Sequence, residues 1–179
     1  ALATGQVWLA TGSDLGGSLR IPASFCSVVG LRPTAGLVAH GPRILPFSNL
    51  AVEGPMGRNV MDLSLLLDAQ SGININDPIS MHGNSISYVD SASMPIRPSK
   101  IAYSPDLGIA KVDSEVLEIC SKALSKFESA GSKIELIDSY FDKAEDTFQV
   151  LRAAYFAMNM DNILKNHREE LKKEIEDWV

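Results

Sequence analysis

Short apolar stretches alternate with amphipathic ones along most of this chain, and that alternation predicts an α/β layered fold. Apolar runs with strand character are expected to form β-strands at residues 6–11, 27–31, 37–40, 101–103 and 134–137. Apolar residues at helical spacing predict helices that begin near residues 60, 114 and 142. Residues 73–98 are polar and include three prolines, so we expect a long loop there.

Two polar residues occupy the positions of helix N-caps. Asn59 precedes the first helical stretch, which has Asp62 in its first turn and is expected to end near Gly72. Asp113 precedes the second stretch, which Gly131 is expected to close. The apolar residues expected to share one face of that second helix are Val116, Cys120, Ala123, Phe127 and Ala130.

The C-terminal third is expected to be helical from Asp142. The residues of this helix that are expected to face inward are Phe148, Leu151, Tyr155 and Met158. Residues 165–179 are highly charged, and their apolar residues Leu171, Ile175 and Trp178 fall on one stripe. We expect an ordinary amphipathic helix packed on the domain, with a partner-binding or dimer helix as the alternative. No domain boundary is evident at the end, so we also expect truncation at the C-terminus.

The stretch Gly12–Pro22 places a serine, Ser18, directly after two adjacent glycines, with an arginine and a proline just after it. An amide is a poor electrophile, so its hydrolysis needs an activated nucleophile and donors that stabilise negative charge on the carbonyl oxygen. The adjacent glycines Gly16 and Gly17 let the chain curl tightly, because they lack a Cβ. Backbone N–H groups can then face one oxyanion beside the Ser18 hydroxyl. The alternative is a glycine turn with an incidental serine.

Other short motifs do not fit this stretch. A nucleophile elbow requires glycine two residues after the serine, where this chain has Arg20. A phosphate-binding loop requires lysine at the position of Ser18, and no dinucleotide fingerprint is present. No Cys or His spacing suggests a metal site. We therefore expect neither a cofactor nor a metal.

Residues 12–34 taken together closely resemble the signature segment of the amidase signature enzymes, which are serine hydrolases that cleave carboxylic amides. Residues 50–58, 101–108 and 112–116 are also similar to segments of that family, and the similarity is weakest after about Asp161. The resemblance implies part of the amidase fold, a large mixed β-sheet flanked by α-helices. It also implies that residues 1–179 are a single, partial amidase domain.

The resemblance implies a role for each residue of the glycine loop. Ser18 matches the nucleophile, and the residues expected to form the oxyanion hole are Leu15, Gly16 and Gly17. Asp14 and Arg20 are expected to brace the loop through a charge-assisted pair, with direct substrate contact as the alternative. Ser27 departs from the glycine that is more usual in the family, which puts only the local packing in doubt.

The family's Ser–cisSer–Lys triad is incomplete in this chain. The resemblance places the second serine, in a Gly/Ser-rich run, and the lysine before the nucleophile. Only 17 residues precede Ser18, and they contain no lysine. The lysines, from Lys100 to Lys173, are all far downstream and mostly in charged, surface-like stretches. We therefore expect a fragment that is inactive, or nearly so, whose parent is an amidase with a small-molecule amide substrate.

Composition narrows the remaining possibilities. The formal net charge of −6 and the absence of a basic stripe argue against a nucleic-acid partner. No apolar run approaches the roughly 20 residues that span a bilayer, so no membrane partner is expected. Cys26 and Cys120 are expected to be buried thiols in a reducing cytoplasm, and a cysteine nucleophile at Cys26 is the alternative. A homo-oligomer is possible.

Three other functions stay open. One is the amidase subunit of a glutamyl-tRNA amidotransferase, although Leu50–Glu53 looks more like a general amidase. Another is a non-catalytic interaction or structural domain that retains the fold. A Ser-His-Asp hydrolase is the last, and its candidate histidines are His40, His82 and His167.

Overall fold

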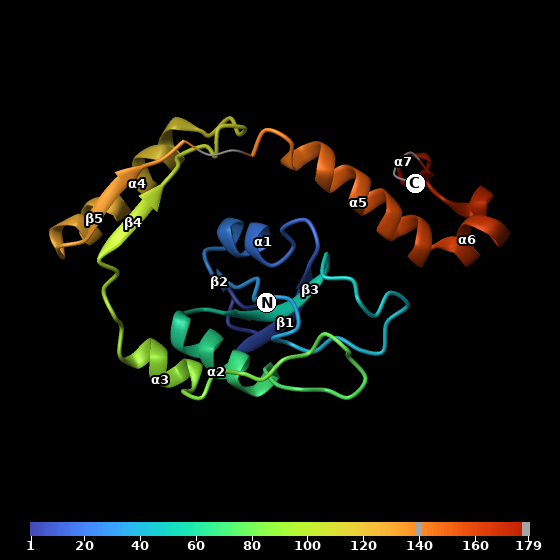
Figure 1. Ribbon diagram of the computed structural model, residues 1–179, viewed down its shortest axis with the longest axis horizontal. Coiled ribbons are helices and arrows are strands. Elements are labelled where there is room, and N and C mark those ends of the chain that lie inside the picture. Colours follow the sequence, from blue (N-terminus) through green and yellow to red (C-terminus); the bar gives the residue numbers. More distant parts are fainter. Residues whose placement is uncertain (139–140, 177–179) are drawn as a thin grey trace. The chain divides into compact units, whose positions relative to one another are not determined.

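The structure is a computed structural model that describes residues 1–138 and 141–176 and divides into two compact units. One unit comprises residues 1–94 together with the chain from residue 154, and the other comprises residues 95–153. Helices and strands occur in both units, so the predicted α/β class is confirmed. Figure 1 follows the elements along the chain from blue to red.

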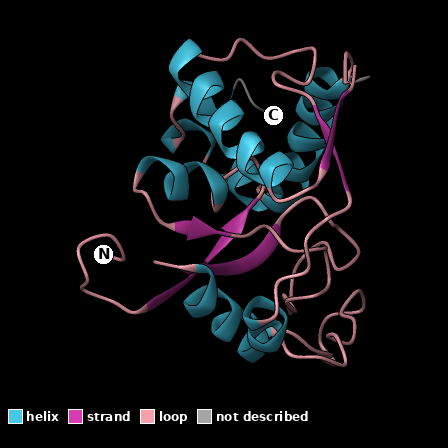
Figure 2. Ribbon diagram, turned by 90° about the vertical axis from the view of Figure 1, so that its left-hand side faces the viewer, coloured by secondary structure: helices cyan, strands magenta, loops and turns pink. Residues whose placement is uncertain are grey.

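A three-stranded antiparallel sheet lies at the centre of the first unit, and Figure 2 shows its strands side by side. It consists of β1 (Leu9–Asp14), β2 (Val29–Gly30) and β3 (Val52–Gly57), with β3 in the middle. Gly12 of β1 lies opposite Gly54 of β3 in the register. Successive side chains of a strand point to opposite faces, so these two glycines lie on the same face of the sheet.

Leu19 fills the space that the missing side chains of Gly12 and Gly54 leave on that face. A Cβ on Gly54 would lie 2.8 Å from Leu19 Cδ1, and one on Gly12 would lie 3.0 Å from Leu19 Cδ2. Leu19 immediately precedes α1 (Arg20–Phe25), whose Ala23 is also buried. The glycines therefore allow α1 and the turn before it to approach the sheet closely.

The opposite face of the sheet is covered by α2 (Val60–Gln70), and Figure 1 shows α1 and α2 on either side of the strands. A Cβ on Gly57 would lie 2.8 Å from the backbone nitrogen of Leu63 in α2. Leu63 and Leu67 are both buried, at 5% and 3% exposure. The sheet is thus covered by helices on both faces.

The second unit contains a β–α–β arrangement in which the two strands are parallel. Its elements are β4 (Lys100–Tyr103), α4 (Ser114–Ser129) and β5 (Lys133–Leu136). The predicted strands at residues 101–103 and 134–137 are therefore confirmed, each shifted by one residue at one or both ends. Four elements follow in the chain, namely α5 (Ala144–Asn159), α6 (Asp161–Asn166), η1 (Arg168–Glu170) and α7 (Lys173–Glu176).

Both predicted N-caps are confirmed. The side chain of Asn59 accepts a hydrogen bond of 2.8 Å from the N–H of Asp62, and Asp113 accepts one of 2.8 Å from the N–H of Glu115. Gly131 follows α4 with a φ of +92°, the left-handed conformation of a glycine that ends a helix. Short-range capping chemistry therefore predicted these helix ends correctly.

Two elements, α1 and β3, are not among those that the sequence predicts, and each contains a proline. Pro22 lies in the first turn of α1, where a backbone N–H has no helical acceptor in any case. Pro55 lies one residue beyond the part of β3 that pairs with β2, so the missing N–H of the proline leaves no gap in the hydrogen bonds between these two strands. The carbonyl oxygen of Pro55 accepts a hydrogen bond of 3.2 Å from the N–H of Leu31. The predicted strand at residues 37–40 is reduced to bridges at Val38, and the predicted strand at residues 6–11 begins only at Leu9.

The expected loop at residues 73–98 contains a helix, α3 (Tyr88–Ser93). Ser87 caps it, and Asp68 of α2 accepts hydrogen bonds from the N–H groups of Tyr88 at 2.7 Å and Val89 at 3.1 Å. A six-residue helix is not stable by itself, so the contacts from α2 are what make it possible. Such long-range contacts are not visible in the local sequence.

Two expectations for the C-terminal third are wrong within the described residues. Leu151 and Met158 of α5 are 52% and 51% exposed rather than turned inward. The helix expected from residue 165 onwards is interrupted, because α6 ends at Asn166 and only a 3₁₀ turn and the short α7 follow. Trp178, expected on the apolar stripe of that helix, lies outside the described residues. Among the described helices, none is long and apolar enough to cross a membrane.

Replacing Leu19 with alanine tests the packing of α1 on the face of the sheet that carries Gly12 and Gly54. We expect Leu19→Ala to lower the free energy of unfolding by about 2–5 kcal/mol, because the side chain is fully buried and would leave a cavity. Leu65 of α2 is a matched control at 58% exposure, and Leu65→Ala should change stability by no more than about 0.5 kcal/mol. Urea unfolding measures both, and equal effects would contradict this account of the packing.

Candidate active site

Ser18 lies in the short turn between β1 and α1, where it is exposed between two buried neighbours. Gly17 is buried on one side of it, and Leu19 is 0% exposed on the other. The φ of Gly17 is +114°, and Ile21 Cδ1 lies 2.6 Å from the position that a Cβ on Gly17 would occupy. The backbone conformation therefore favours glycine at position 17, because a side chain is strained at this φ, whereas Ile21 is 53% exposed and could move aside.

The carboxylate of Asp14 holds this turn together. Its side chain is 0% exposed, and it accepts hydrogen bonds from the N–H groups of Gly17 at 2.8 Å and Leu19 at 3.3 Å. Those two residues flank Ser18, so one carboxylate holds the backbone on both sides of the serine. Arg20 adds a bidentate pair, with Nε 2.9 Å and Nη2 3.1 Å from the two carboxylate oxygens. The predicted Asp14–Arg20 pair is therefore present.

Arg32 is the member of this cluster that the sequence analysis did not single out. Its Nη1 donates to the main-chain carbonyl oxygen of Asp14 and lies 3.2 Å from the carboxylate Oδ1 of the same residue. Its Nη2 donates to the carbonyl oxygen of Leu50 at 3.0 Å. Arg32 falls within the stretch that resembles the signature segment, but nothing in a spacing of 18 residues indicates contact with Asp14.

These contacts determine the protonation of Asp14. Burial by itself would raise the pKa of the carboxyl group. The hydrogen bonds from Arg20, Gly17 and Leu19, together with the charge of Arg20, outweigh burial and hold the pKa of Asp14 well below its ordinary value. Asp14 is therefore a carboxylate at neutral pH, and its hydrogen bonds hold the backbone of the turn.

The N–H groups of the turn fall into two sets. Gly17 donates its N–H to Asp14, whereas those of Leu15, Gly16 and Ser18 donate to no acceptor in the described part of the chain. Unpaired backbone N–H groups in the turn that carries a serine hydroxyl are the type of donor that an oxyanion hole uses. The predicted set of Leu15, Gly16 and Gly17 stays a prediction, in which Gly17 would have to share its N–H with the carboxylate.

In the part of the chain that the structure describes, the Ser18 hydroxyl has no base as a partner. Within residues 1–138 and 141–176, its Oγ forms no hydrogen bond with any side chain. His40 lies 3.1 Å from Glu53, and His167 lies 2.9 Å from Glu170, but neither pair is bonded to Ser18. Glu53 is on the sheet face opposite to the one that Leu19 covers, because it is out of phase with Gly54 in β3.

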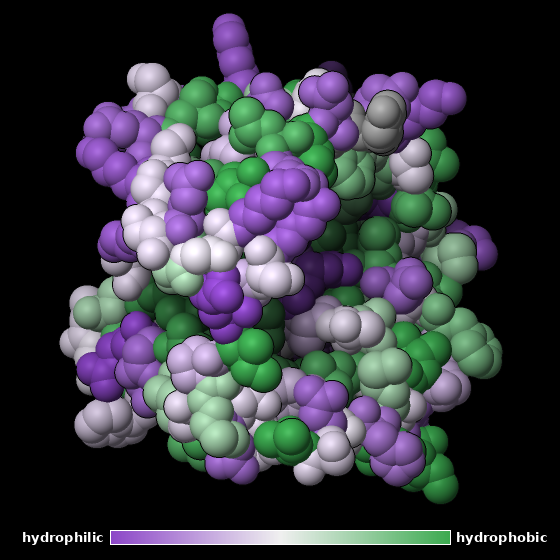
Figure 3. Space-filling model, turned by 60° about the vertical axis from the view of Figure 1, so that its left-hand side comes forward, coloured by the Kyte–Doolittle hydropathy of each residue, from purple (hydrophilic) through white to green (hydrophobic). Residues whose placement is uncertain are grey.

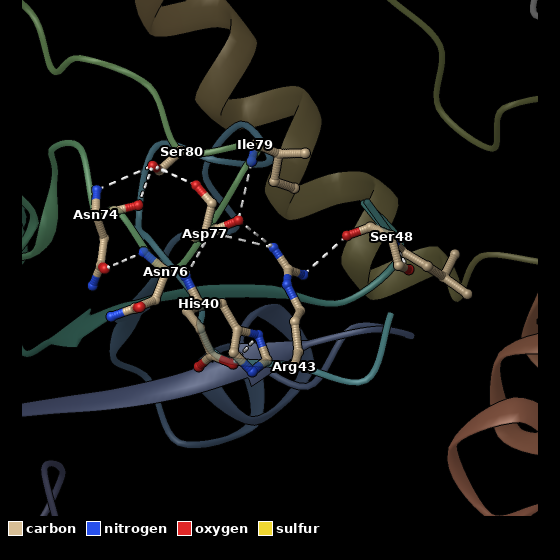
Figure 4. A network of polar contacts seen from close by, with 10 residues as sticks. His40, Arg43, Ser48, Asn74, Asn76, Asp77, Ile79 and Ser80 are labelled. Carbon is tan, nitrogen blue, oxygen red and sulfur yellow. Dashed lines mark hydrogen bonds and ion pairs between the residues drawn. The ribbon is translucent and has the colours of Figure 1, made fainter. Parts of the chain in front are cut away.

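A second buried carboxylate, Asp77, organises the neighbouring loops, as Figure 4 shows. Asp77 accepts a hydrogen bond of 2.8 Å from the N–H of His40 and pairs with Arg43 Nη2 at 3.3 Å. Burial raises its pKa, but the hydrogen bonds from His40, Ile79 and Arg43 outweigh that effect and lower it. Arg43 also donates from Nη1 to the carbonyl oxygen of Ser48 at 2.9 Å.

The expectation that Cys26 and Cys120 are buried is wrong, because both are exposed. Phe25, next to Cys26, is itself 87% exposed. Figure 3 likewise shows hydrophobic residues among hydrophilic ones on the face that it draws. Among the described residues, no group of three or more His, Cys, Asp or Glu side chains is placed to hold a metal ion.

Comparison with known proteins identifies the family. The family model described as amidase matches residues 1–178, which is nearly the whole chain. The chain belongs to the amidase family. This amidase-family chain is 36% identical over 180 residues to an acylamidase of Rhodococcus erythropolis. It is 34% identical over 183 residues to a glutamyl-tRNA(Gln) amidotransferase subunit of Clostridium botulinum. Each alignment covers 100% of this chain and 37% of the relative, so this chain spans little more than a third of their length.

Solved structures have the same fold. A bacterial aryl acylamidase of the amidase signature family superposes with a TM-score of 0.82 over 99% of this chain and 39% of its own, at 24% identity. A 6-aminohexanoate cyclic dimer hydrolase superposes with a TM-score of 0.78 over 100% of this chain and 40% of its own, at 27% identity. The expected amidase signature fold is therefore confirmed.

The pKa of Asp14 leads to a prediction about acid stability. Because that pKa is lower in the folded chain than the value of about 3.9 for the unfolded chain, the stabilisation from Asp14 is complete above about pH 5 and is lost as the pH falls below about 4. Asp14→Asn should therefore destabilise the chain at neutral pH, on the order of 2–3 kcal/mol, by leaving the arginines without their counter-charge. Urea unfolding from pH 7 to pH 3 should show the difference from the wild type narrowing, whereas a constant difference would contradict the prediction.

Proposed function

We propose that this amidase-family chain is the nucleophile-bearing part of an enzyme that hydrolyses the C–N bond of a carboxylic amide. The observation that supports this most strongly is the position of Ser18, exposed between two N–H groups that the buried carboxylate of Asp14 holds in place. The N–H groups of Leu15 and Gly16, three and two residues before the serine, are unpaired in the described chain. A nucleophile and a ready oxyanion site are the two components that acyl transfer requires.

In the proposed reaction, the Ser18 hydroxyl oxygen attacks the amide carbonyl carbon and forms a tetrahedral intermediate. The carbonyl oxygen becomes negatively charged and accepts hydrogen bonds from the N–H groups of the turn, for which Leu15, Gly16 and Gly17 are the proposed donors. The C–N bond then breaks, the amine or ammonia leaves with a proton, and an ester to Ser18 remains. Water hydrolyses that ester and releases the acid.

The base that removes the hydroxyl proton is expected from sequence upstream of this chain. The family resemblance assigns that role to a lysine that acts through a second serine, and the first lysine in this chain is Lys100. A serine hydroxyl without a base is a poor nucleophile at neutral pH. We therefore propose that the chain alone is inactive, or nearly so, and that activity belongs to a longer gene product.

The substrate and the setting are also proposals. We propose a small linear amide as the substrate, and the similarity to an acylamidase supports its amide chemistry. A cytoplasmic location and a homo-oligomeric state belong to the same proposal.

A second candidate function is that of the amidase subunit of a glutamyl-tRNA amidotransferase. It is favoured by the 34% identity to a subunit of such an enzyme, which is nearly as high as the identity to the acylamidase. Both functions would use the same serine chemistry on an amide. Release of ammonia from glutamine only when partner subunits are present would favour the amidotransferase, and hydrolysis of simple amides without partners would favour the general amidase.

Labelling with a fluorophosphonate probe tests the nucleophile. We expect Ser18 to be labelled in the gene product extended upstream through the Gly/Ser-rich run and its lysine, and not in residues 1–179 alone. Ser18→Ala should abolish the label. Ser13→Ala is the matched control, because Ser13 is an exposed serine five residues earlier, and it should leave labelling intact. Intact mass and peptide mapping report the site.

Three results would count against the proposal. No label in either folded protein would favour a non-catalytic domain. A label on Ser13 or on a cysteine would place the nucleophile elsewhere. Labelling of residues 1–179 at the full rate would remove the need for an upstream base.

A further inference from the structure

The peptide group between Asp14 and Leu15 is held at one end and free at the other. Its carbonyl oxygen, which belongs to Asp14, accepts a hydrogen bond from Arg32 Nη1. Its N–H, which belongs to Leu15, donates to no acceptor in the described chain. In a trans peptide the C=O and N–H bonds point in opposite directions. The contact with Arg32 therefore determines the direction in which the N–H of Leu15 points.

Arg32 is suited to hold this peptide group because it is itself held at several points. Nη1 contacts both the main chain and the carboxylate of Asp14, and Nη2 donates to the carbonyl oxygens of Leu50 at 3.0 Å and Asn49 at 3.5 Å. A planar guanidinium makes such contacts in a fixed geometry, whereas the ammonium group of lysine is a single point charge. The side chain is 26% exposed, so it is largely shielded from water.

The charge of Arg32 exceeds what the carboxylate needs. Arg20 already forms a bidentate pair with Asp14, which balances one negative charge with one positive charge. Arg32 adds a second positive charge directly on the carbonyl oxygen of the 14–15 peptide. A cation bonded to a carbonyl oxygen polarises the peptide group and strengthens its N–H as a donor. The surplus charge therefore favours negative charge on a group that this N–H would bind.

We propose that Arg32 is a positioning residue of the oxyanion hole, which orients and polarises the N–H of Leu15 through the carbonyl oxygen of Asp14. This inference rests on the proposed amidase function, and it assigns Arg32 a part in that reaction without contact with the substrate. Arg32 acts on the attack step, when negative charge develops on the carbonyl oxygen. The contacts predict a loss of rate rather than a loss of binding.

The chain offers a matched control in Arg43. Like Arg32, Arg43 pairs through one guanidinium nitrogen with a fully buried aspartate, Asp77, and donates from another to a main-chain carbonyl oxygen, that of Ser48. Among the described contacts of Arg43, none is with the turn that contains Ser18. Loss of either arginine leaves a buried carboxylate with one cation fewer, so both should destabilise the fold, but only loss of Arg32 should affect the reaction.

The experiment uses the full-length gene product and the saturable rate of fluorophosphonate labelling at Ser18. We expect Arg32→Met to lower the limiting first-order rate about 10- to 100-fold, with the half-saturating probe concentration changed less than threefold. Arg32→Lys should also lower the limiting labelling rate, because lysine keeps the positive charge but lacks the planar guanidinium that makes several hydrogen bonds at once. Methylguanidinium should restore part of the rate to Arg32→Ala. Arg43→Met should label at close to the wild-type rate once the folded fraction, measured by thermal unfolding, is taken into account.

Each other outcome has a distinct meaning. If the wild-type protein labels at Ser18 and Arg32→Met labels at the same limiting rate, the role of Arg32 is overturned and the proposed function stands. Equal loss of rate in Arg32→Met and Arg43→Met would reduce Arg32 to a structural residue and also overturn the inference. If Arg32→Met does not fold, Arg32→Lys decides in the same way. A wild-type protein without label at Ser18 would remove the proposed function and this inference together.

Discussion

The buried carboxylate of Asp14 is the constraint on which the turn around Ser18 depends. A carboxylate out of contact with water is costly unless charged and hydrogen-bonding partners replace the lost hydration. Here two arginines and the N–H groups of Gly17 and Leu19 supply that replacement. These hydrogen bonds also fix the position of each partner, because the carboxylate oxygens accept hydrogen bonds only in limited directions. The ion cluster thus determines the path of the backbone on both sides of Ser18.

Packing of Leu19 against the sheet also holds the turn around Ser18 in place. The strands beneath the turn present glycines at positions 12 and 54, and Leu19 fills the space where their side chains would lie. A larger residue at either position would push Leu19 outward, and with it one of the N–H groups that Asp14 holds. The exposure of Ser18 is therefore a consequence of burial on both sides of it. Neither the glycines nor the ion cluster would fix the turn without the other.

The sequence predicted best what depends on neighbours in the chain. The N-caps Asn59 and Asp113, and the pairing of Asp14 with Arg20, involve residues two to six positions apart, where spacing and chemistry are sufficient. It failed where a distant residue decides the outcome, as with α3, whose first N–H groups are bound by Asp68. It also failed on burial, as at Cys26, because an apolar residue is buried only if some part of the chain covers it. The role of Arg32 belongs to the same class, since its partners lie 18 residues away in both directions.

The way the turn divides its N–H groups connects the fold to the proposed chemistry. A carboxylate close to an oxyanion site would ordinarily oppose the reaction, since like charges repel. Asp14 avoids this because its charge is already bound by Arg20, Gly17 and Leu19, and because Arg32 leaves the cluster with a net positive charge. Of the proposed oxyanion donors, the N–H groups of Leu15 and Gly16 donate to no acceptor in the described part of the chain and stay open to a substrate oxygen. One aspartate can therefore order a turn that is suited to bind a negatively charged oxygen, because the two arginines bound to it carry more charge than its carboxylate.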